Sequence, residues 1–329
     1  MGTGRDMIAL LRSHAKGDDG EFYARAMQVA AREARLGHRR LAAELKTAID
    51  EAKAERSRGA ALLVMQPRPE LAGLVSISTP GLRLAAVVLP RGTRERLQQF
   101  VIEQKQSRRL RERGLRPRSR LLLLGPPGTG KTMTAGALAG ELHLPLLTVL
   151  LEGVITKFMG ESAAKLRLIF DAMAHTSGVY LFDEFDAIGS RRDQRNDVGE
   201  VRRILNSFLQ MMDSAEAPGL IIAATNHPDL LDPALFRRFD DVVEYGLPSA
   251  DAAWEVVKSR LAAFPCSADL TQAAHLAAGL SQADIARACD EAAKRVVLNG
   301  AEEVRDEDLR AAIEERRHAY RPAPAGGRP

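Results

Sequence analysis

The feature that most constrains this chain is a glycine-rich loop placed between an apolar run and a helix-forming segment. Residues 121–124 read LLLL, residues 125–132 read GPPGTGKT, and residues 133–142 have the composition of a helix. This order of strand, loop and helix is the context in which the pattern G-x-x-x-x-G-K-[ST] binds phosphate. A chance glycine turn is the alternative, and the preceding apolar run argues against it.

The residue types in this loop follow from the chemistry of phosphate binding. Glycines let backbone N–H groups approach phosphate oxygens without interference from a Cβ atom, and the N-terminus of the next helix adds positive potential. Lys131 supplies a cation for the β- and γ-phosphates, and Thr132 offers a hydroxyl to Mg²⁺. The predicted nucleotide-binding residues of the loop are Pro126, Pro127, Gly128, Thr129, Gly130, Lys131, Thr132 and Met133.

Two carboxylates follow a second buried-strand pattern. Residues 179–182 read VYLF and are followed by Asp183 and Glu184. Because the chain turns at a strand end, both side chains can face one crevice, where Asp183 completes the Mg²⁺ site and Glu184 polarises the attacking water. For the pair alone, an acidic turn without catalytic meaning is the alternative. Asp186 is interpreted as a solvated or structural carboxylate.

Two weaker signals lie further along the chain. Asn226 follows the apolar run 220–224, and its amide can orient the water if that strand lies between the two motif strands. An asparagine shortly before Pro228 also begins ordinary turns. Arg237 and Arg238 are either a solvated surface pair or arginine fingers that stabilise the phosphoryl group transferred in a neighbouring copy. The second interpretation requires an oligomer.

The apolar runs also predict the fold class and the domains. Runs at 121–124, 146–150, 179–183, 220–224 and 242–245 alternate with helical stretches, which predicts an α/β fold with a parallel five-stranded sheet covered on both faces. After Pro248 the pattern is helical only, with Ser281 as an expected N-cap. The expected divisions are an N-terminal helical bundle that recruits a partner or substrate (1–58), a linker (59–81), a large α/β domain (82–248), a helical lid (249–318) and a disordered tail (319–329).

Composition excludes several other classes of protein. Of 329 residues, 45% are hydrophobic and 27% charged, which is the balance of an ordinary globular chain. No apolar run is long enough for a membrane span. The two cysteines are not accompanied in the sequence by other residues in a metal-binding pattern, which favours a reducing cytoplasm as the location. The basic stretch 105–120 contains no aromatic residue for base stacking. A solvated surface is therefore the favoured interpretation, and nucleic-acid binding is not expected.

Taken together, these motifs resemble the AAA family of ATPases. The likeness covers residues 82–317 and includes the phosphate loop, the acidic pair, Thr225-Asn226 and the DPALFRRFD segment at 232–240. It ends at GLSQAD, residues 279–284, which is similar to the G-x-S-G-A-D segment of the family's helical lid. The resemblance implies ATP and Mg²⁺ as cofactors, a homo-oligomer of six subunits, and finger roles for Arg237 and Arg238. Phe236, Gln282 and the pair Asp213-Ser214 depart from the family pattern, and the last leaves inter-subunit signalling less certain.

The resemblance also covers a loop that would contact the substrate. Residues 156–162 read TKFMGES and are similar to the family's first pore loop. By this likeness Lys157, Phe158 and Met159 are expected to grip an extended polypeptide in the channel of the ring, since aromatic and thioether groups contact any backbone. A core position for Phe158 is the alternative. A second pore loop is expected within 190–199.

The chain is further similar to stand-alone bacterial AAA ATPases that are often encoded beside a subtilisin-like serine protease, in systems suspected of plasmid exclusion or phage defence. The resemblance thus implies a possible protease partner, and this chain carries no protease signature of its own. We expect an Mg²⁺-dependent ATPase ring that remodels, unfolds or threads protein substrates. The alternatives are a nucleotide-switched binding module that activates a partner without threading, and a motor bound to DNA.

Overall fold

The computed structural model describes residues 69–155, 161–189, 198–214 and 219–319, together with short helical pieces at 26, 27, 29–31, 42, 43, 45 and 47. The chain divides into two units, Met1–Gln66 and Pro67–Pro329. Most of the expected N-terminal bundle, the first pore loop with Lys157, Phe158 and Met159, most of the expected second pore loop, and the tail lie outside the described residues.

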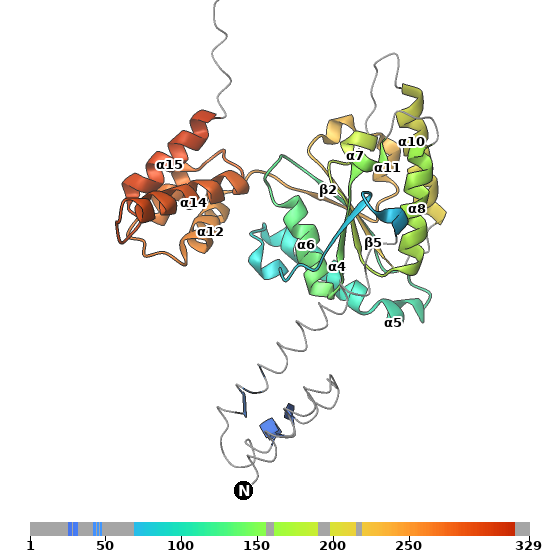
Figure 1. Ribbon diagram of the computed structural model, residues 1–329, viewed down its shortest axis with the longest axis horizontal. Coiled ribbons are helices and arrows are strands. Elements are labelled where there is room, and N and C mark those ends of the chain that lie inside the picture. Colours follow the sequence, from blue (N-terminus) through green and yellow to red (C-terminus); the bar gives the residue numbers. More distant parts are fainter. Residues whose placement is uncertain are drawn as a thin grey trace, which may run out of the picture. The chain divides into compact units, whose positions relative to one another are not determined.

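The second unit is built on a six-stranded sheet flanked by helices (Figure 1). The strands are β1 (Val75–Ser78), β2 (Arg120–Leu124), β3 (Leu146–Val149), β4 (Val179–Phe182), β5 (Leu220–Thr225) and β6 (Asp241–Glu244). The longer helices of the sheet domain are α4 (Arg91–Lys105), α6 (Lys131–Leu142), α8 (Glu161–His175) and α10 (Val198–Ser214). Shorter helices are η1 (Pro69–Leu71), η2 (Leu84–Ala86), α5 (Ser107–Arg111), α7 (Leu151–Val154), α9 (Asp186–Gly189), η3 (Pro228–Leu230) and α11 (Pro233–Phe236).

The strand order is β1-β3-β4-β5-β2-β6. Strands β2 to β6 pair in parallel, which confirms the predicted α/β class and places each of the five predicted apolar runs in a strand. The sheet also has a sixth strand, because β1 pairs antiparallel with β3 inside the segment 59–81 that was predicted to be a linker. This strand has only four residues and alternates between buried and more exposed positions, so it lacks the continuous apolar run that revealed the others.

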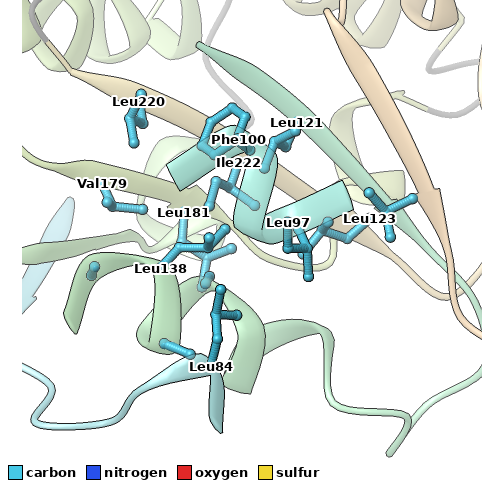
Figure 2. Packing of buried hydrophobic residues seen from close by; sticks show 14 of the residues in the cluster. Leu84, Leu97, Phe100, Leu121, Leu123, Leu138, Val179, Leu181, Leu220 and Ile222 are labelled. Atoms are coloured by element: carbon cyan, nitrogen blue, oxygen red, sulfur yellow. The ribbon is translucent and has the colours of Figure 1, made fainter. Parts of the chain in front are cut away.

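Both faces of the sheet are buried. On one face, Leu97 and Phe100 of α4 and Leu138 of α6 pack against alternate strand residues such as Leu123 and Leu181 (Figure 2). Phe182 is next to Leu181 in β4 and therefore points to the other face. There its ring lies 5.2 Å from that of Phe208 in α10 and 6.3 Å from that of Phe170 in α8. This two-sided burial explains why the central strands β4 and β5 are buried at every position and consist almost entirely of apolar residues.

Four helices form the lid, with a core of their own. They are α12 (Ala250–Leu261), α13 (Leu270–Leu276), α14 (Gln282–Leu298) and α15 (Asp306–Ala319). The predicted N-cap is confirmed, since the Ser281 hydroxyl accepts a hydrogen bond from the Asp284 N–H at the start of α14. On α12, the ammonium group of Lys258 lies 4.4 Å from the ring centre of the half-buried Trp254.

The basic stretch 105–120 is only partly the solvated surface that was predicted. Arg108 and Glu112 form an exposed pair one helical turn apart. Arg118 instead lies between two elements: its guanidinium donates to Glu103 of α4 at 2.7 Å and to Asp241 of β6 at 2.6 Å. Its side chain is 25% exposed, so this arginine has a structural partner on each side. In the part of the chain that the structure describes, no helix combines the length and apolar character that a membrane span requires.

Candidate functional site

The phosphate loop connects β2 to α6 and is shaped by two close contacts. At Gly125, whose φ is 143°, an added Cβ would lie 2.2 Å from the carbonyl oxygen of Tyr245. At Gly128, whose φ is 76°, it would lie 2.4 Å from the hydroxyl of Ser281 in the lid. Any larger residue at either position would clash and be strained, so the glycines are required by the fold as well as by phosphate binding.

Lys131 lies at the centre of the loop. Its ammonium group donates to the carbonyl oxygens of Gly125 at 2.7 Å and Pro126 at 2.8 Å, and to Oδ1 of Asn226 at 2.7 Å. Strand β5 does lie between β2 and β4, which is the condition under which Asn226 was predicted to reach this site. Burial lowers the pKa of Lys131, while Asp183 and Asp186 act in the opposite direction.

The acidic pair lies opposite this lysine. The Thr132 hydroxyl donates to Asp183 Oδ2 at 2.6 Å, so the two expected Mg²⁺ ligands lie side by side. Glu184 follows with a left-handed backbone, at a φ of 51°, and its N–H donates to Asp183 Oδ1 at 3.0 Å. The Asp186 carboxylate accepts from the Thr225 hydroxyl at 2.7 Å, in keeping with the structural role expected of it.

The phosphate loop, the acidic pair and Asn226 line one cavity of about 590 Å³, which also reaches the lid. Of the predicted residues it is lined by Pro127, Gly128, Gly130, Lys131, Thr132, Met133, Asp183, Glu184 and Asn226. Pro126 and Thr129 are not in the lining: the carbonyl of Pro126 accepts from Lys131 and from the Thr129 hydroxyl, at 2.8 Å in both cases. They therefore hold the loop in shape from behind.

The remaining residues of the cavity lining were not predicted one by one. They combine the apolar residues Ala86, Val88, Val256, Ala283 and Ala286 with the polar residues Ser259, Arg260, Gln282 and Arg287. Gln282 donates from Nε2 to the carbonyl of Val88 at 3.0 Å, and the N–H of Ala283 donates to the carbonyl of Gly128 at 3.0 Å. The GLSQAD segment was the available signal, since these two residues belong to it. The lid is thus hydrogen-bonded both to the phosphate loop and to the chain before α4.

Arg237 and Arg238 do not line this cavity. Arg238 forms an ion pair with Asp213 near the end of α10. Arg237 is exposed, and within the described part of the chain its guanidinium group has no hydrogen-bonded or ionic partner. The arginine pair is therefore separate from the chain's own phosphate loop, and Arg237 is the more available of the two.

Comparisons with known proteins agree with this geometry. Residues 121–247 match the family model described as ATPase family associated with various cellular activities (AAA). Over 318 residues, 96% of each chain, the protein is 34% identical to an uncharacterized AAA family ATPase of Sinorhizobium fredii. This chain belongs to the AAA family. It is accordingly an ATPase that uses ATP with Mg²⁺.

Other relatives in the AAA family share only part of their length with this chain. The ATP-dependent zinc metalloprotease FtsH of Helicobacter pylori is 34% identical over 252 residues, which is 73% of this chain and 40% of that protein. A proteasome-activating nucleotidase of Methanococcus vannielii is 38% identical over 208 residues, 61% of this chain and 51% of that protein. These relatives support ATP-driven action on proteins and self-association at the level of the family.

The cavity suits the ligands of the family. Its volume is in the ordinary range for a cofactor site. Its lining offers apolar side chains such as Val88 and Val256 to a base and the Lys131 cation to the phosphates. The oxygens of Thr132 and Asp183, 2.6 Å apart, are the hard donors that Mg²⁺ prefers.

Proposed function

We propose that this protein forms a ring of six copies in which ATP hydrolysis remodels, unfolds or threads protein substrates. The observation that carries the proposal is the separation of two sets of residues. Lys131, Asp183, Glu184 and Asn226 meet in one cavity, while the arginine pair lies outside it. Two lid arginines, Arg260 and Arg287, do line this cavity, so the residues left without a place in it are Arg237 and Arg238. In a ring with head-to-tail interfaces, that pair would face the cavity of a neighbouring copy.

Within one subunit, each polar side chain has a distinct role in the proposal. Lys131 neutralises phosphate charge, and Thr132 and Asp183 would hold Mg²⁺, which when bound offsets charge on the β- and γ-phosphates. Glu184 accepts a proton from the attacking water, and Asn226 orients that water. The contact between Asn226 and Lys131 supports this, since it places the amide beside the group that binds the γ-phosphate.

Glu184→Gln is the direct test of the catalytic assignment. The amide preserves shape but cannot take a proton, so we expect ATP binding to persist while turnover falls at least about 100-fold. Calorimetry and steady-state phosphate release measure the two quantities. Glu152→Gln is the matched control, because Glu152 is exposed on α7 and lies outside the cavity. Turnover near that of the control would remove Glu184 from its role.

The proposal extends to the first pore loop, where Lys157, Phe158 and Met159 would grip the substrate. Phe158→Ala separates threading from nucleotide switching. Under threading, we expect loss of substrate unfolding with ATP hydrolysis within about twofold of the parent chain, because Phe158 belongs to none of the motifs assigned to the nucleotide. Measuring the unfolding of a fluorescent substrate together with the ATPase rate distinguishes threading from switching. Unfolding at the parent rate would favour a switch that activates a partner without threading.

We also propose a subtilisin-like serine protease as partner and residues 1–58 as the recruiting segment. The support is the resemblance to stand-alone bacterial AAA ATPases, together with the names of two relatives, a metalloprotease and a proteasome-activating nucleotidase. A Glu184→Gln chain, held in its ATP-bound form, should retain the partner during purification from its native cells. Copurification of a subtilisin-like protease would support the proposed partner. Loss of that protease when residues 1–58 are deleted would support their role in recruiting it.

A further inference from the structure

Behind the phosphate loop lies a buried polar pair that the catalytic assignments do not use. The hydroxyl of Tyr245, just after β6, donates to Oγ1 of Thr134 in α6 at 2.9 Å. The Thr134 hydroxyl in turn donates to the carbonyl oxygen of Gly130 at 2.9 Å. Gly130 is the last residue of the loop before α6, so the two hydroxyls form a short hydrogen-bonded chain that ends on the loop itself.

The surroundings of this pair are apolar. Tyr245 is 7% exposed and belongs to the same hydrophobic cluster as Leu138 and Val243, and Thr134 is fully buried. Buried hydroxyls are unfavourable unless they are paired, and aliphatic side chains would fill the same space without that requirement. Burial raises the pKa of Tyr245 to about 12, so its hydroxyl remains protonated and continues to donate. Packing alone therefore does not account for this pair.

The backbone of Tyr245 contacts the other end of the loop. Its N–H donates to the carbonyl of Leu124 at 2.7 Å, and its own carbonyl oxygen occupies the space beside Gly125, where a Cβ would lie 2.2 Å away. One residue thus supports the first glycine of the loop directly and the last one through Thr134. The lid helix α12 begins only a few residues later, at Ala250.

We propose that Tyr245 and Thr134 are positioning residues for the phosphate loop, which they hold from behind in the shape that binds the triphosphate. The Gly130 carbonyl also accepts from the Thr134 N–H at 2.8 Å, so the hydroxyl adds a second hydrogen bond to it. This second bond further limits rotation of the peptide groups whose N–H atoms face the phosphates. The proposal rests on ATP binding by this loop. It adds that a residue at the junction of sheet and lid sets the geometry of the loop.

Tyr245→Phe tests the first of the two hydrogen bonds, from Tyr245 to Thr134. It removes one hydroxyl and keeps the ring, so we expect affinity for ATP, measured with a fluorescent ATP analogue, to fall about threefold to tenfold, with kcat within twofold and a matching rise in KM. Tyr180→Phe is the control, because Tyr180 in β4 is 1% exposed and its hydroxyl donates to the Thr176 carbonyl, away from the loop. Equal affinities of the two variants would overturn the proposal.

Substitutions at Thr134 test the second hydrogen bond, from Thr134 to Gly130. Thr134→Ser keeps the hydroxyl and should retain the affinity of the parent chain, whereas Thr134→Val keeps the shape and should weaken binding as Tyr245→Phe does. If Thr134→Val fails to fold, hydrogen exchange at residues 128–131 of Tyr245→Phe, compared with Tyr180→Phe, replaces it, and faster exchange is expected. Equal exchange would contradict the proposal. Absence of ATP binding by the parent chain would instead refute the function on which it rests.

Discussion

At the scale of single residues, the site depends on backbone conformations that most side chains avoid. Glu184 has a φ of 51°, and such a conformation costs a non-glycine residue about 1–3 kcal/mol. The neighbouring hydrogen bonds hold it there: its own N–H donates to Asp183, and the N–H of Phe185 donates to the carbonyl of Ala224 in β5 at 2.8 Å. The turn directs both carboxylates into the same cavity, which a regular strand could not do.

Gly128→Ala is the prediction that belongs to this scale. The new Cβ would lie 2.4 Å from the Ser281 hydroxyl and 3.1 Å from Ala283, at a φ of 76° that alanine disfavours. We expect the lid to be displaced from the phosphate loop and ATP affinity to fall at least about tenfold, measured by calorimetry. Gly92→Ala is the control, since nothing lies within 4 Å of its added Cβ. Unchanged affinity in Gly128→Ala would mean that the lid contact is dispensable.

Sequence reasoning reached the residues of the site whose chemistry is visible in a short pattern. The contact between Thr132 and Asp183 joins two motifs that follow β2 and β4, whose carboxyl ends lie at the same edge of the sheet with only β5 between them. The pairing of Tyr245 with Thr134 could not be predicted, because each is a common residue in an apolar segment and only the register of β6 against β2 brings them together. For Gln282 the GLSQAD segment was a signal, but its contact with the Val88 carbonyl could not be predicted, because only the placement of the lid brings these two distant residues together.

At the scale of elements, a cluster of charges joins α4, the segment before β2, and β6. Arg118 bridges Glu103 and Asp241, and Arg96 of α4 also pairs with Asp241. Asp241 is 6% exposed, so its charge is stabilised by these two guanidinium groups. The cluster orients the strand that leads to Tyr245 and the lid.

This cluster predicts a pH dependence. The hydrogen bonds from Arg118 hold the pKa of Glu103 below its ordinary value of 4.5. The contribution of ionised Glu103 to the free energy of unfolding is therefore fully present above pH 4.5. It is lost as the pH falls through the lower pKa that Glu103 has in the folded state. We expect Glu103→Gln to lower the free energy of unfolding by about 1 kcal/mol at pH 7, with the difference shrinking in strong acid.

Urea unfolding of Glu103→Gln and of the parent chain, at neutral pH and in acid, measures the difference in free energy of unfolding under each condition. Glu112→Gln is the control, because the pair of Glu112 with Arg108 is exposed and should contribute little at either pH. A difference between Glu103→Gln and the parent chain that is the same at neutral and acid pH would contradict the linkage.

Some elements could be predicted from the sequence and others could not. The five parallel strands were predicted because burial on both faces makes each a continuous apolar run. Strand β1 was missed, since at an edge of the sheet only Val75 of its four residues is buried and Ile77 is half-buried. Arg118 was missed because a charged residue among other arginines looks solvated until α4 and β6 bring acids to it.

At the scale of the whole molecule, the proposed ring predicts complementation between two inactive variants. Arg237→Ala should bind ATP without hydrolysing it, as should Glu184→Gln. In mixed rings, a subunit with an intact Glu184 can receive Arg237 from a Glu184→Gln neighbour. We expect an equal mixture to recover about a quarter of the parent activity, measured by phosphate release, because about one interface in four then has both groups.

The control for the complementation test is each variant alone at the same total concentration. A mixture no more active than its components would show that the arginine acts within its own subunit or has no catalytic role.

The position of Trp254 has a practical consequence. It is the only tryptophan in the 329 residues, and it lies on α12, the helix that contributes Val256 to the nucleotide cavity. Its ring is half-buried beneath the Lys258 ammonium, an arrangement whose indole emission depends on the local field and solvent. We therefore expect nucleotide binding that shifts the lid to change the fluorescence of Trp254, so that binding could be followed in the unmodified protein without an attached dye.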